Sequence, residues 1–260
     1  FKILDDKKID ILFECIGQSD GISKKIVEKA LNDKIHVITP NKALISKHGD
    51  YLSKIAEKKK VNLEFEASVG GGIPILRTIK EGLSTNIITK VYGILNGTCN
   101  YILSEMDKTN DNFKNVLKKA QSLGYAEPGD PKLDINGYDT LAKVRILSSL
   151  AFKKKISRNN LLMEGIEFIE PKDFKIANQL NLKIKLLGIT EIINNSLFER
   201  VHPCLVKKKS YIGNVDGVMN AVILEGKPVG ENILQGEGAG PGPTSSALMS
   251  DLLSILIGNI

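Results

Sequence analysis

The chain has 260 residues, 42% of them hydrophobic and 25% charged, and its 36 basic and 30 acidic side chains give a formal net charge of +6. No run of about 18 apolar residues predicts a membrane span, and the lysines lie in short scattered clusters without a nucleic-acid-binding motif. We therefore expect a soluble protein of two modest domains that binds neither membranes nor nucleic acid.

The cysteines and the first eight residues indicate in which cellular compartment the protein is expected. Cys15, Cys99 and Cys204 are odd in number and widely spaced, which argues against a disulfide framework or a zinc site and favours the reducing cytoplasm. Residues 1–8 do not begin with methionine and lack the zones of a signal peptide. We expect the chain to begin within a domain, so that part of the functional protein precedes it.

The first 66 residues alternate short apolar runs with helical patterns. These patterns predict strands over 9–16, 34–39 and 61–66, and helices over 22–31 and 40–59. Ser19 or Ser23 can cap the first helix. The alternation predicts βαβ units and a parallel sheet, whose ligands lie beyond the carboxyl ends of the strands. The GxGxxG turn of a dinucleotide-binding fold is absent, so either the fold differs or its first strand precedes Phe1.

A glycine-rich segment over 67–74 leads into a predicted helix over 73–82. Glycines permit unusual φ values and close backbone approach, and the carbonyl and N–H groups of such a turn can coordinate a cation or approach a phosphate. The alternative is a tight strand-to-helix turn without a ligand. Spacing alone leaves both readings open.

The rest of the chain favours an α+β arrangement with an antiparallel sheet. Strands are predicted over 86–97, 182–191, 197–206 and 218–224, and helices over 98–106, 112–122 and 171–180 and from 244 onward. Thr98 can cap the first of these helices. A further helix can start at Asp134, Asn136 or Gly137 and ends near Ala151.

That further helix places a lysine on a face that is otherwise apolar. Asp139 and Lys143 are i,i+4 neighbours, so they can form a surface ion pair that contributes about 0.2–0.5 kcal/mol. However, Lys143 points toward the side that the helix must bury. The alternative is therefore a desolvated amine that transfers protons near neutral pH, with a carboxylate to hold it.

Acidic residues gather just before this helix. Glu127, Asp130 and Asp134 suit a substrate that carries an ammonium group. A divalent cation is the rival ligand for such carboxylates, but no histidine joins them and their spacing matches no EF-hand.

Five segments, in order and spread over nearly the whole chain, resemble homoserine dehydrogenase. They are 39–43 (TPNKA), 66–74 (EASVGGGIP), 96–103 (NGTCNYIL), 124–143 and 236–247 (GEGAGPGPTSSA). The resemblance implies a Rossmann-like parallel sheet, incomplete here, that belongs to a nucleotide-binding domain over 1–66. It further implies an α+β substrate and dimerisation domain with an open sheet over 67–240, and a C-terminal helix over 241–260 that returns to the first domain. The missing glycine turn would precede Phe1, and the ACT domain of the family would be absent.

The reaction implied by the resemblance is the reversible oxidation of L-homoserine to L-aspartate 4-semialdehyde with NAD or NADP. This reaction leads to threonine, methionine and isoleucine, and we expect it in a cytoplasmic homodimer. Lys143 matches the acid/base lysine of the family and Asp139 the residue that orders it, while Lys42 matches a second lysine at the cofactor and substrate. Glu127, Asp134 and Asp139 match the positions that bind the substrate amino group.

The resemblance also implies ligand-binding residues elsewhere. The cofactor cleft would be lined by Ile16, Gly17, Lys42, Asn96, Gly97, Gly238 and Gly240. A sodium ion would be held through backbone carbonyls of Glu66, Val69, Gly71 and Ile73. Three departures from the family pattern are an extra residue, Gly129, in the loop of Glu127, Cys99 in place of a threonine, and Pro241-Gly242-Pro243 beside the cofactor glycines.

Two other functions stay open. One is a non-catalytic member of the family that binds substrate and dimerises, and the other is a dehydrogenase that acts on another semialdehyde or amino acid. The choice between NAD and NADP cannot be made, because the discriminating residue of such folds follows the glycine turn by about 20 residues.

Overall fold

The computed structural model describes Leu4, residues 8–152 and residues 161–258, and these fall into two units. The first unit is formed by Phe1–Thr78 and Ala239–Ile260, and the second by Ile79–Gly238. Each unit has its own sheet, and each is described by itself below. Among the described residues, no helix is long and apolar enough to cross a membrane.

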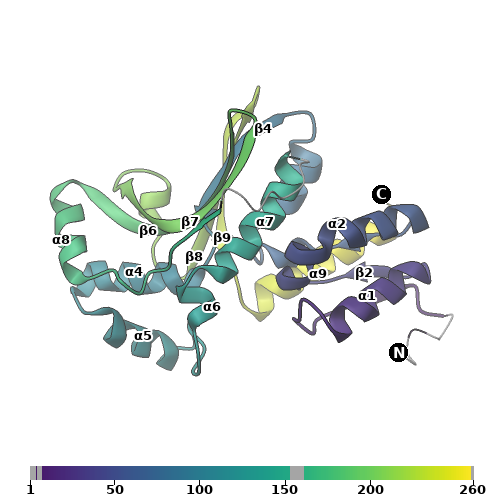
Figure 1. Ribbon diagram of the computed structural model, residues 1–260, viewed down its shortest axis with the longest axis horizontal. Helices are drawn as coiled ribbons and strands as arrows, with labels where there is room; N and C mark the ends of the chain where they lie inside the picture. Colours follow the sequence, from purple (N-terminus) through teal and green to yellow (C-terminus); the bar gives the residue numbers. More distant parts are fainter. Residues whose placement is uncertain (1–3, 5–7, 153–160, 259–260) are drawn as a thin grey trace. The chain divides into compact units, whose positions relative to one another are not determined.

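The first unit contains the predicted parallel sheet. Its strands are β1 (Ile11–Phe13), β2 (His36–Ile38) and β3 (Leu63–Glu64), in the order β1-β2-β3. The connecting helices are α1 (Ile22–Asn32) and α2 (Lys42–Lys59), which pack against each other beside β2 (Figure 1). The βαβ prediction is thereby confirmed. The strands are shorter than the apolar runs suggested, because parallel pairing ends where the connections begin.

One cap prediction in this unit is wrong. Gly21 is the N-cap of α1 and provides no side-chain oxygen. Ser19 donates to Asp20 instead, and Ser23 lies fully buried inside the helix. In α2, by contrast, the Asn41 side chain caps the helix by accepting a hydrogen bond from Leu44 N at 3.0 Å.

The C-terminal helix α9 (Pro241–Leu256) completes the first unit and packs on β2 and on the 3₁₀ turn η2 (Glu66–Ser68). It begins earlier than predicted, because Pro241 occupies the first helical position, where a missing N–H costs nothing. The helix predicted over 73–82 is divided into α3 (Ile75–Arg77) and a π-helical turn, η3 (Thr78–Gly82).

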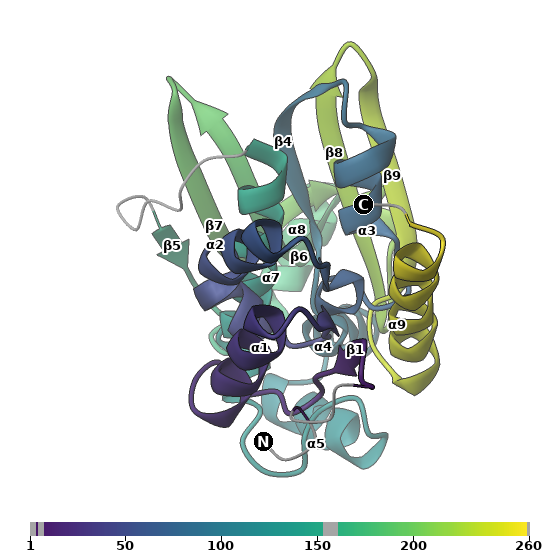
Figure 2. The same cartoon turned by 90° about the vertical axis from the view of Figure 1, so that its right-hand side faces the viewer.

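The second unit is built on a mixed sheet, confirming the antiparallel prediction for its main strands. The strands are β4 (Ile87–Ile94), β5 (Leu161–Met163), β6 (Leu182–Ile193), β7 (Ser196–Lys207), β8 (Met219–Lys227) and β9 (Gly230–Glu237). Their order is β5-β7-β6-β4-β8-β9, and among these pairs only β5 and β7 run parallel. Figure 2 shows the β8–β9 hairpin beside β4. The sequence patterns predicted neither β5 nor β9.

The helices of this unit pack on the sheet or on one another. They are α4 (Gly97–Thr109), α5 (Phe113–Ser122), α6 (Lys132–Ile135), α7 (Tyr138–Phe152) and α8 (Pro171–Gln179). Helix α7 packs on β4, β6 and β7, and α4 packs on β6 and β8. The approach of α7 is close at Gly188, where an added Cβ would lie 2.6 Å from Val144 Cγ2. Gly137, with φ +87°, separates α6 from α7, so the helix predicted to reach Ala151 begins after that glycine.

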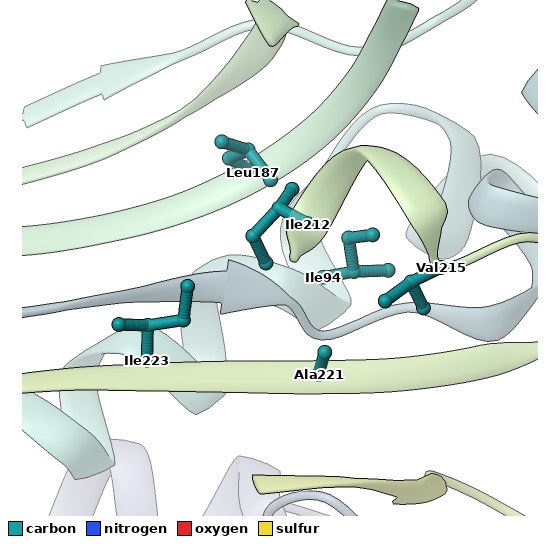
Figure 3. Packing of buried hydrophobic residues seen from close by; sticks show 6 residues of the cluster. All are labelled: Ile94, Leu187, Ile212, Val215, Ala221 and Ile223. Carbon is teal, nitrogen blue, oxygen red and sulfur yellow. The ribbon is translucent and has the colours of Figure 1, made fainter. Parts of the chain in front are cut away.

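The face of the sheet opposite α7 carries an apolar cluster (Figure 3). Strand residues alternate between faces, and Thr190 bonds to Ser148 of α7, so Leu187 and Ile189 point away from α7. The cluster contains Ile94, Leu187, Ile212, Val215, Ala221 and Ile223. The turn η5 (Ile212–Asn214) lies over it, and partly buried side chains surround it, namely Tyr92, Ile189, Cys204, Val206 and Met219.

Candidate active site

The centre of the candidate site is an ion pair within α7. Lys143 and Asp139 are each only 8% exposed, and Lys143 Nζ donates to Asp139 Oδ2 at 2.8 Å. The same Nζ donates to the backbone oxygen of Leu95 at 2.7 Å. The prediction that Lys143 points inward is confirmed, and the alternative of a surface ion pair is wrong. The reason is that α7 lies flat on the sheet, so its i,i+4 face is covered.

Asn96 connects this ion pair to a second carboxylate. Its Nδ2 donates to Asp139 Oδ2 at 2.9 Å and to Asp134 Oδ1 at 2.8 Å, while its Oδ1 accepts from Cys99 N at 2.8 Å and caps α4. Thr98 was the predicted cap, and this prediction is wrong. Its hydroxyl donates to the backbone oxygen of Tyr125 instead, at 2.5 Å.

The structure therefore brings together Asn96, Asp134, Asp139 and Lys143 from three elements, the start of α4, α6 and α7. The buried thiol of Cys99 donates to the backbone oxygen of Asp134 at 3.3 Å. Burial raises the pKa of Cys99 well above its usual value, and the two nearby carboxylates raise it further. The thiol thus stays neutral beside these carboxylates.

The other predicted acidic residues lie in a different environment. Glu127 is exposed on the loop after α5, and its backbone oxygen accepts from Gln121 Nε2 at 2.9 Å. Asp130 is also exposed and pairs with Lys132 at 3.2 Å. Among the described residues, no group of three or more His, Cys, Asp or Glu side chains could hold a metal ion.

Two glycines of the second unit that were predicted to line the cofactor cleft have packing roles. A Cβ at Gly97 would lie 2.6 Å from the backbone oxygen of Val218, and a Cβ at Gly238 would lie 1.9 Å from Asn220 Nδ2. Any side chain at these positions would displace the start of α4 or the end of β9. Their role with a cofactor stays a prediction.

In the first unit, the carboxyl ends of β1 and β2 are joined by Glu14, a residue that the sequence reasoning missed. Glu14 is 2% exposed, and its carboxylate accepts from Ile16 N at 2.9 Å, Thr39 Oγ1 at 2.7 Å and Asn41 Nδ2 at 3.2 Å. Asn41 Nδ2 also donates to the backbone oxygen of Gln18 at 2.8 Å. The available signal was a carboxylate, Glu14, near the end of the apolar run IDILFECI, which Gly17 follows.

The Glu14 network shapes the region where parallel sheets bind ligands. It fixes the turn of Ile16 and Gly17, with φ +84° at the glycine, and it lies beside Lys42, the first residue of α2. Gly240, with φ +114°, is the N-cap of α9 in the same unit. The remaining residues predicted for the cofactor, Asn96, Gly97 and Gly238, belong to the second unit.

The segment predicted to hold sodium also lies in the first unit. The Glu66 carboxylate accepts from Leu76 N at 2.9 Å and Arg77 N at 2.7 Å. The chain between them turns back at Gly70 and Gly71, with φ +75° and +55°. The predicted ligands Val69, Gly71 and Ile73 are buried. Neutral carbonyl oxygens in such a turn are a donor set that suits a hard monovalent cation.

A carboxylate from α9 holds this segment at its start. Asp251 is 1% exposed, and its Oδ2 accepts from Glu66 N at 3.0 Å. Arg77 reaches the same part of α9 and donates to Ser250 Oγ at 2.8 Å. Burial raises the pKa of Asp251 to about 7, against the opposing effect of the Glu66 N–H.

Comparisons with known proteins identify the family. Residues 74–253 match the family model described as homoserine dehydrogenase, and residues 1–66 match the model of its NAD binding domain. The chain belongs to the homoserine dehydrogenase family. The resemblance carried by the five sequence motifs is thereby confirmed.

Curated homoserine dehydrogenases are similar over almost the whole chain. The protein from Neisseria gonorrhoeae is 43% identical over 98% of this chain, and that from Helicobacter pylori is 44% identical over 97%. The chain spans 58% and 59% of the length of these two relatives.

Solved structures of homoserine dehydrogenases confirm the α/β fold class. The Thiobacillus denitrificans structure matches with a TM-score of 0.94 and 43% identity, over 98% of this chain and 59% of that one. The Staphylococcus aureus structure at pH 7.5 matches with a TM-score of 0.85 and 38% identity, over 98% of this chain and 62% of that one. A hyperthermophilic archaeal homoserine dehydrogenase solved with NADPH shares the fold, with a TM-score of 0.85 and 24% identity over 99% and 74%.

Proposed function

We propose that this chain carries the site for the reversible, NAD(P)-dependent oxidation of L-homoserine to L-aspartate 4-semialdehyde, in the biosynthesis of threonine, methionine and isoleucine. The observation that supports this most is the state of Lys143, a buried amine with two of its N–H groups directed by Leu95 and Asp139. A lysine ammonium has three donors. Among the described residues its partners account for two, so the third N–H direction is available to a substrate oxygen.

Lys143 is the proposed acid/base residue. In the oxidation direction, its neutral amine accepts the hydroxyl proton of homoserine as the C4–H bond breaks. A bound NAD(P) supplies the hydride acceptor for this reaction, so the protein needs no nucleophile. In the reduction direction, the ammonium returns the proton to the carbonyl oxygen. Asp139 and the Leu95 carbonyl keep the nitrogen in one position through both directions.

The substrate ammonium group is proposed to bind at Asp134 and Glu127, with Asp139 contributing negative charge. Asp134 is half-buried and held by Asn96, which suits a fixed contact. Glu127 lies on an exposed loop that includes Gly129, which suits a contact formed when substrate arrives. Lys42 is proposed at the cofactor and substrate by its match to the family motif.

We propose NAD or NADP as cofactor, held by Ile16, Gly17, Lys42, Gly97, Gly238 and Gly240 and by the main chain of Asn96. The match of residues 1–66 to an NAD binding domain supports this, and so does the NADPH in the related archaeal enzyme. The turn that Glu14 holds also supports the proposal, because it lies at the carboxyl ends of parallel strands, where such sheets bind ligands.

A sodium ion is proposed at the carbonyls of Glu66, Val69, Gly71 and Ile73, where the donor chemistry fits. Replacing sodium by tetramethylammonium at constant ionic strength is expected to lower the rate or the thermal stability. If neither the rate nor the thermal stability changes in a sodium-free sample, the cation assignment is wrong.

A cytoplasmic homodimer is proposed as well. The sheet face opposite α7 presents partly buried apolar side chains around the cluster under η5, including Tyr92, Ile189 and Val206. A second copy could cover such a face. Light scattering of the purified protein gives the mass, and a monomer at micromolar concentration would contradict the dimer.

The direct test of the proposed function is an assay of the full-length protein. We expect NADPH or NADH oxidation that depends on L-aspartate 4-semialdehyde, and NADP or NAD reduction that depends on L-homoserine. Calorimetry with homoserine and with each cofactor separates the alternative. Homoserine binding without cofactor binding and without turnover would favour a non-catalytic, substrate-binding member of the family.

A further inference from the structure

We propose that Asn96 is a positioning residue of the substrate site, because its side-chain amide clamps Asp134 and Asp139 together beside Lys143, and that this side chain does not bind the cofactor. The inference rests on the proposed function. Asn96 is 5% exposed, and its Nδ2 and Oδ1 have three protein partners at 2.8–2.9 Å. The amide is therefore committed to groups on the substrate side.

The two carboxylates need such a clamp because no single rigid element holds both. Asp134 lies on α6, a helix of four residues, whereas Asp139 lies on α7. Gly137, with a positive φ, separates the two helices. Two carboxylates that face one another repel, and each amide N–H offsets this by a charge-assisted hydrogen bond. The amide of Asn96 therefore sets the separation of the two carboxylates.

Asn96 is itself firmly placed. Its side chain caps α4, and one turn later Asn100 Nδ2 donates to the backbone oxygens of Val215 and Met219, both at 3.1 Å. The preceding residue, Leu95, accepts from Lys143 through its backbone oxygen. Consecutive residues thus hold both members of the Lys143–Asp139 pair, one through the main chain and one through the side chain.

The substitution Asn96→Ser separates the two tasks of this side chain. Serine keeps an oxygen that caps α4 but has no N–H₂ group for the carboxylates. We expect kcat/KM for homoserine to fall about 10-fold to 100-fold, with a raised KM and a lowered kcat, while KM for NADP stays within about twofold. The charged or titratable groups that face the amide are Asp134, Asp139, Lys143 and the thiol of Cys99.

The loss of N–H donors also favours protonation of the carboxylates, so the acidic limb of the kcat profile should move to higher pH.

The matched control is Asn112→Ser, which changes the same residue type at the N-cap of α5, where Asn112 Oδ1 accepts from Asn115 N at 3.0 Å. This control should leave all kinetic constants and the pH profile unchanged. Thermal melting of both variants measures the effect of the cap alone.

If Asn96→Ser melts below the assay temperature, Asn96→Asp keeps both the volume and the cap acceptor and places a third carboxylate at the clamp. Its kcat/KM for homoserine should fall further than that of the serine variant. A raised KM for NADP with unchanged homoserine constants would overturn the inference and make Asn96 a cofactor ligand. Kinetics equal to those of Asn112→Ser would also overturn it. An inactive wild-type protein would instead refute the proposed function.

Discussion

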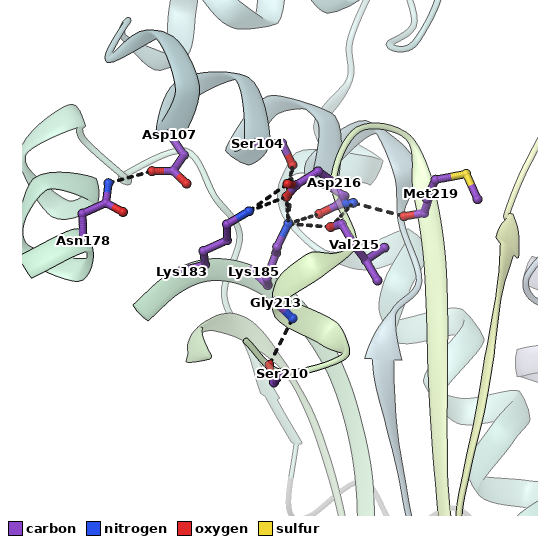
Figure 4. Close-up of polar contacts among 11 residues, drawn as sticks. Ser104, Asp107, Asn178, Lys183, Lys185, Ser210, Gly213, Val215, Asp216 and Met219 are labelled. Atoms are coloured by element: carbon purple, nitrogen blue, oxygen red, sulfur yellow. Dashed lines mark hydrogen bonds and ion pairs between the residues drawn. The ribbon is translucent and has the colours of Figure 1, made fainter. Parts of the chain in front are cut away.

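Among its described residues, the second unit contains two buried lysines, Lys143 and Lys185, whose surroundings differ in one respect. Lys185 is 1% exposed on β6. Its Nζ donates to Asn100 Oδ1 at 3.1 Å, the backbone oxygen of Val215 at 2.6 Å and Asp216 Oδ1 at 2.8 Å (Figure 4). All three of its N–H groups are used within the protein. Burial lowers the pKa of Lys185, although the Asp216 carboxylate acts in the opposite direction.

Lys143, by contrast, has two acceptors among the described residues, and a pair of carboxylates lies beside it. Asn96 and Asn100, one turn apart on α4, take part in the two lysine networks. Burial alone thus does not distinguish Lys143, the proposed acid/base residue, from Lys185. The difference is that the three N–H donors of Lys185 all have acceptors, whereas two acceptors are found for the donors of Lys143 among the described residues.

The largest expected effect separates the two lysines by activity. Lys143→Met keeps most of the side-chain volume but removes the proton carrier, so kcat for homoserine oxidation should fall about 100-fold to 10,000-fold. Steady-state NADP reduction measures this, and thermal melting checks that the variant is folded. A kcat within about threefold of wild type would contradict the acid/base role.

Lys185→Met should give the opposite pattern. It leaves Asn100 Oδ1 without its buried donor and removes one of the two donors to the Val215 carbonyl, so unfolding should cost about 1–3 kcal/mol less. Below the melting range, kcat should stay within about twofold of wild type. Lys183→Met is the matched control, because its ion pair with Asp216 is partly exposed and contributes less than about 1 kcal/mol. Equal urea midpoints for Lys185→Met and Lys183→Met would contradict the larger structural contribution of Lys185.

These lysines also show how far the sequence could lead. The helical spacing predicted that Lys143 points inward, because neighbours on the same face of α7 are apolar. Lys185 lies in LKIKLLGIT, where alternating lysines suggest a solvent-facing strand edge, and its cover by α4 and the 215–216 segment is a tertiary effect. The family motifs predicted the acidic residues but not their hydrogen-bond partners.

Other parts of the fold could not be predicted for local reasons. Asn96 rather than Thr98 caps α4, because the backbone leaves its extended conformation at Asn96, with φ −132° and ψ 113°. Strand β9 reads GENILQGE and alternates half-buried and exposed residues, so it lacks an apolar signal. Glu14 was hidden in an apolar run, although its carboxylate joins the ends of β1 and β2.

Glu14 offers the next largest test, now in the first unit. Glu14→Gln replaces an acceptor oxygen by an N–H₂ group that faces the donors of Ile16, Thr39 and Asn41. The turn before Gly17 should loosen, and the Kd for NADPH should rise about 3-fold to 10-fold. Fluorescence titration measures this. Asp20→Asn, which removes an exposed carboxylate paired with Lys47, is the control, and equal Kd values for both variants would contradict the role of Glu14.

The smallest expected effect concerns pH and Asp251. Its folded-state pKa of about 7 exceeds the unfolded value of about 3.9, so the folded protein binds more protons between these values. Its contribution to stability is therefore largest below about pH 4 and is lost as the pH rises through 7. In the Asp251→Asn variant, the decrease in melting temperature from pH 5 to pH 8 should be smaller than in wild type by a few degrees. Parallel pH dependences for wild type and variant would contradict this.

Chemical rescue of Lys143→Ala tests most directly whether Lys143 carries the proton. Methylammonium, added at constant ionic strength, can enter the space left by the side chain and exchange a proton with the substrate oxygen. We expect kcat of the variant to rise with methylammonium concentration and to stay unchanged with tetramethylammonium, which has no N–H. A folded variant that binds homoserine and NADP, yet shows the same low kcat in both salts, would contradict the proton-transfer role of Lys143.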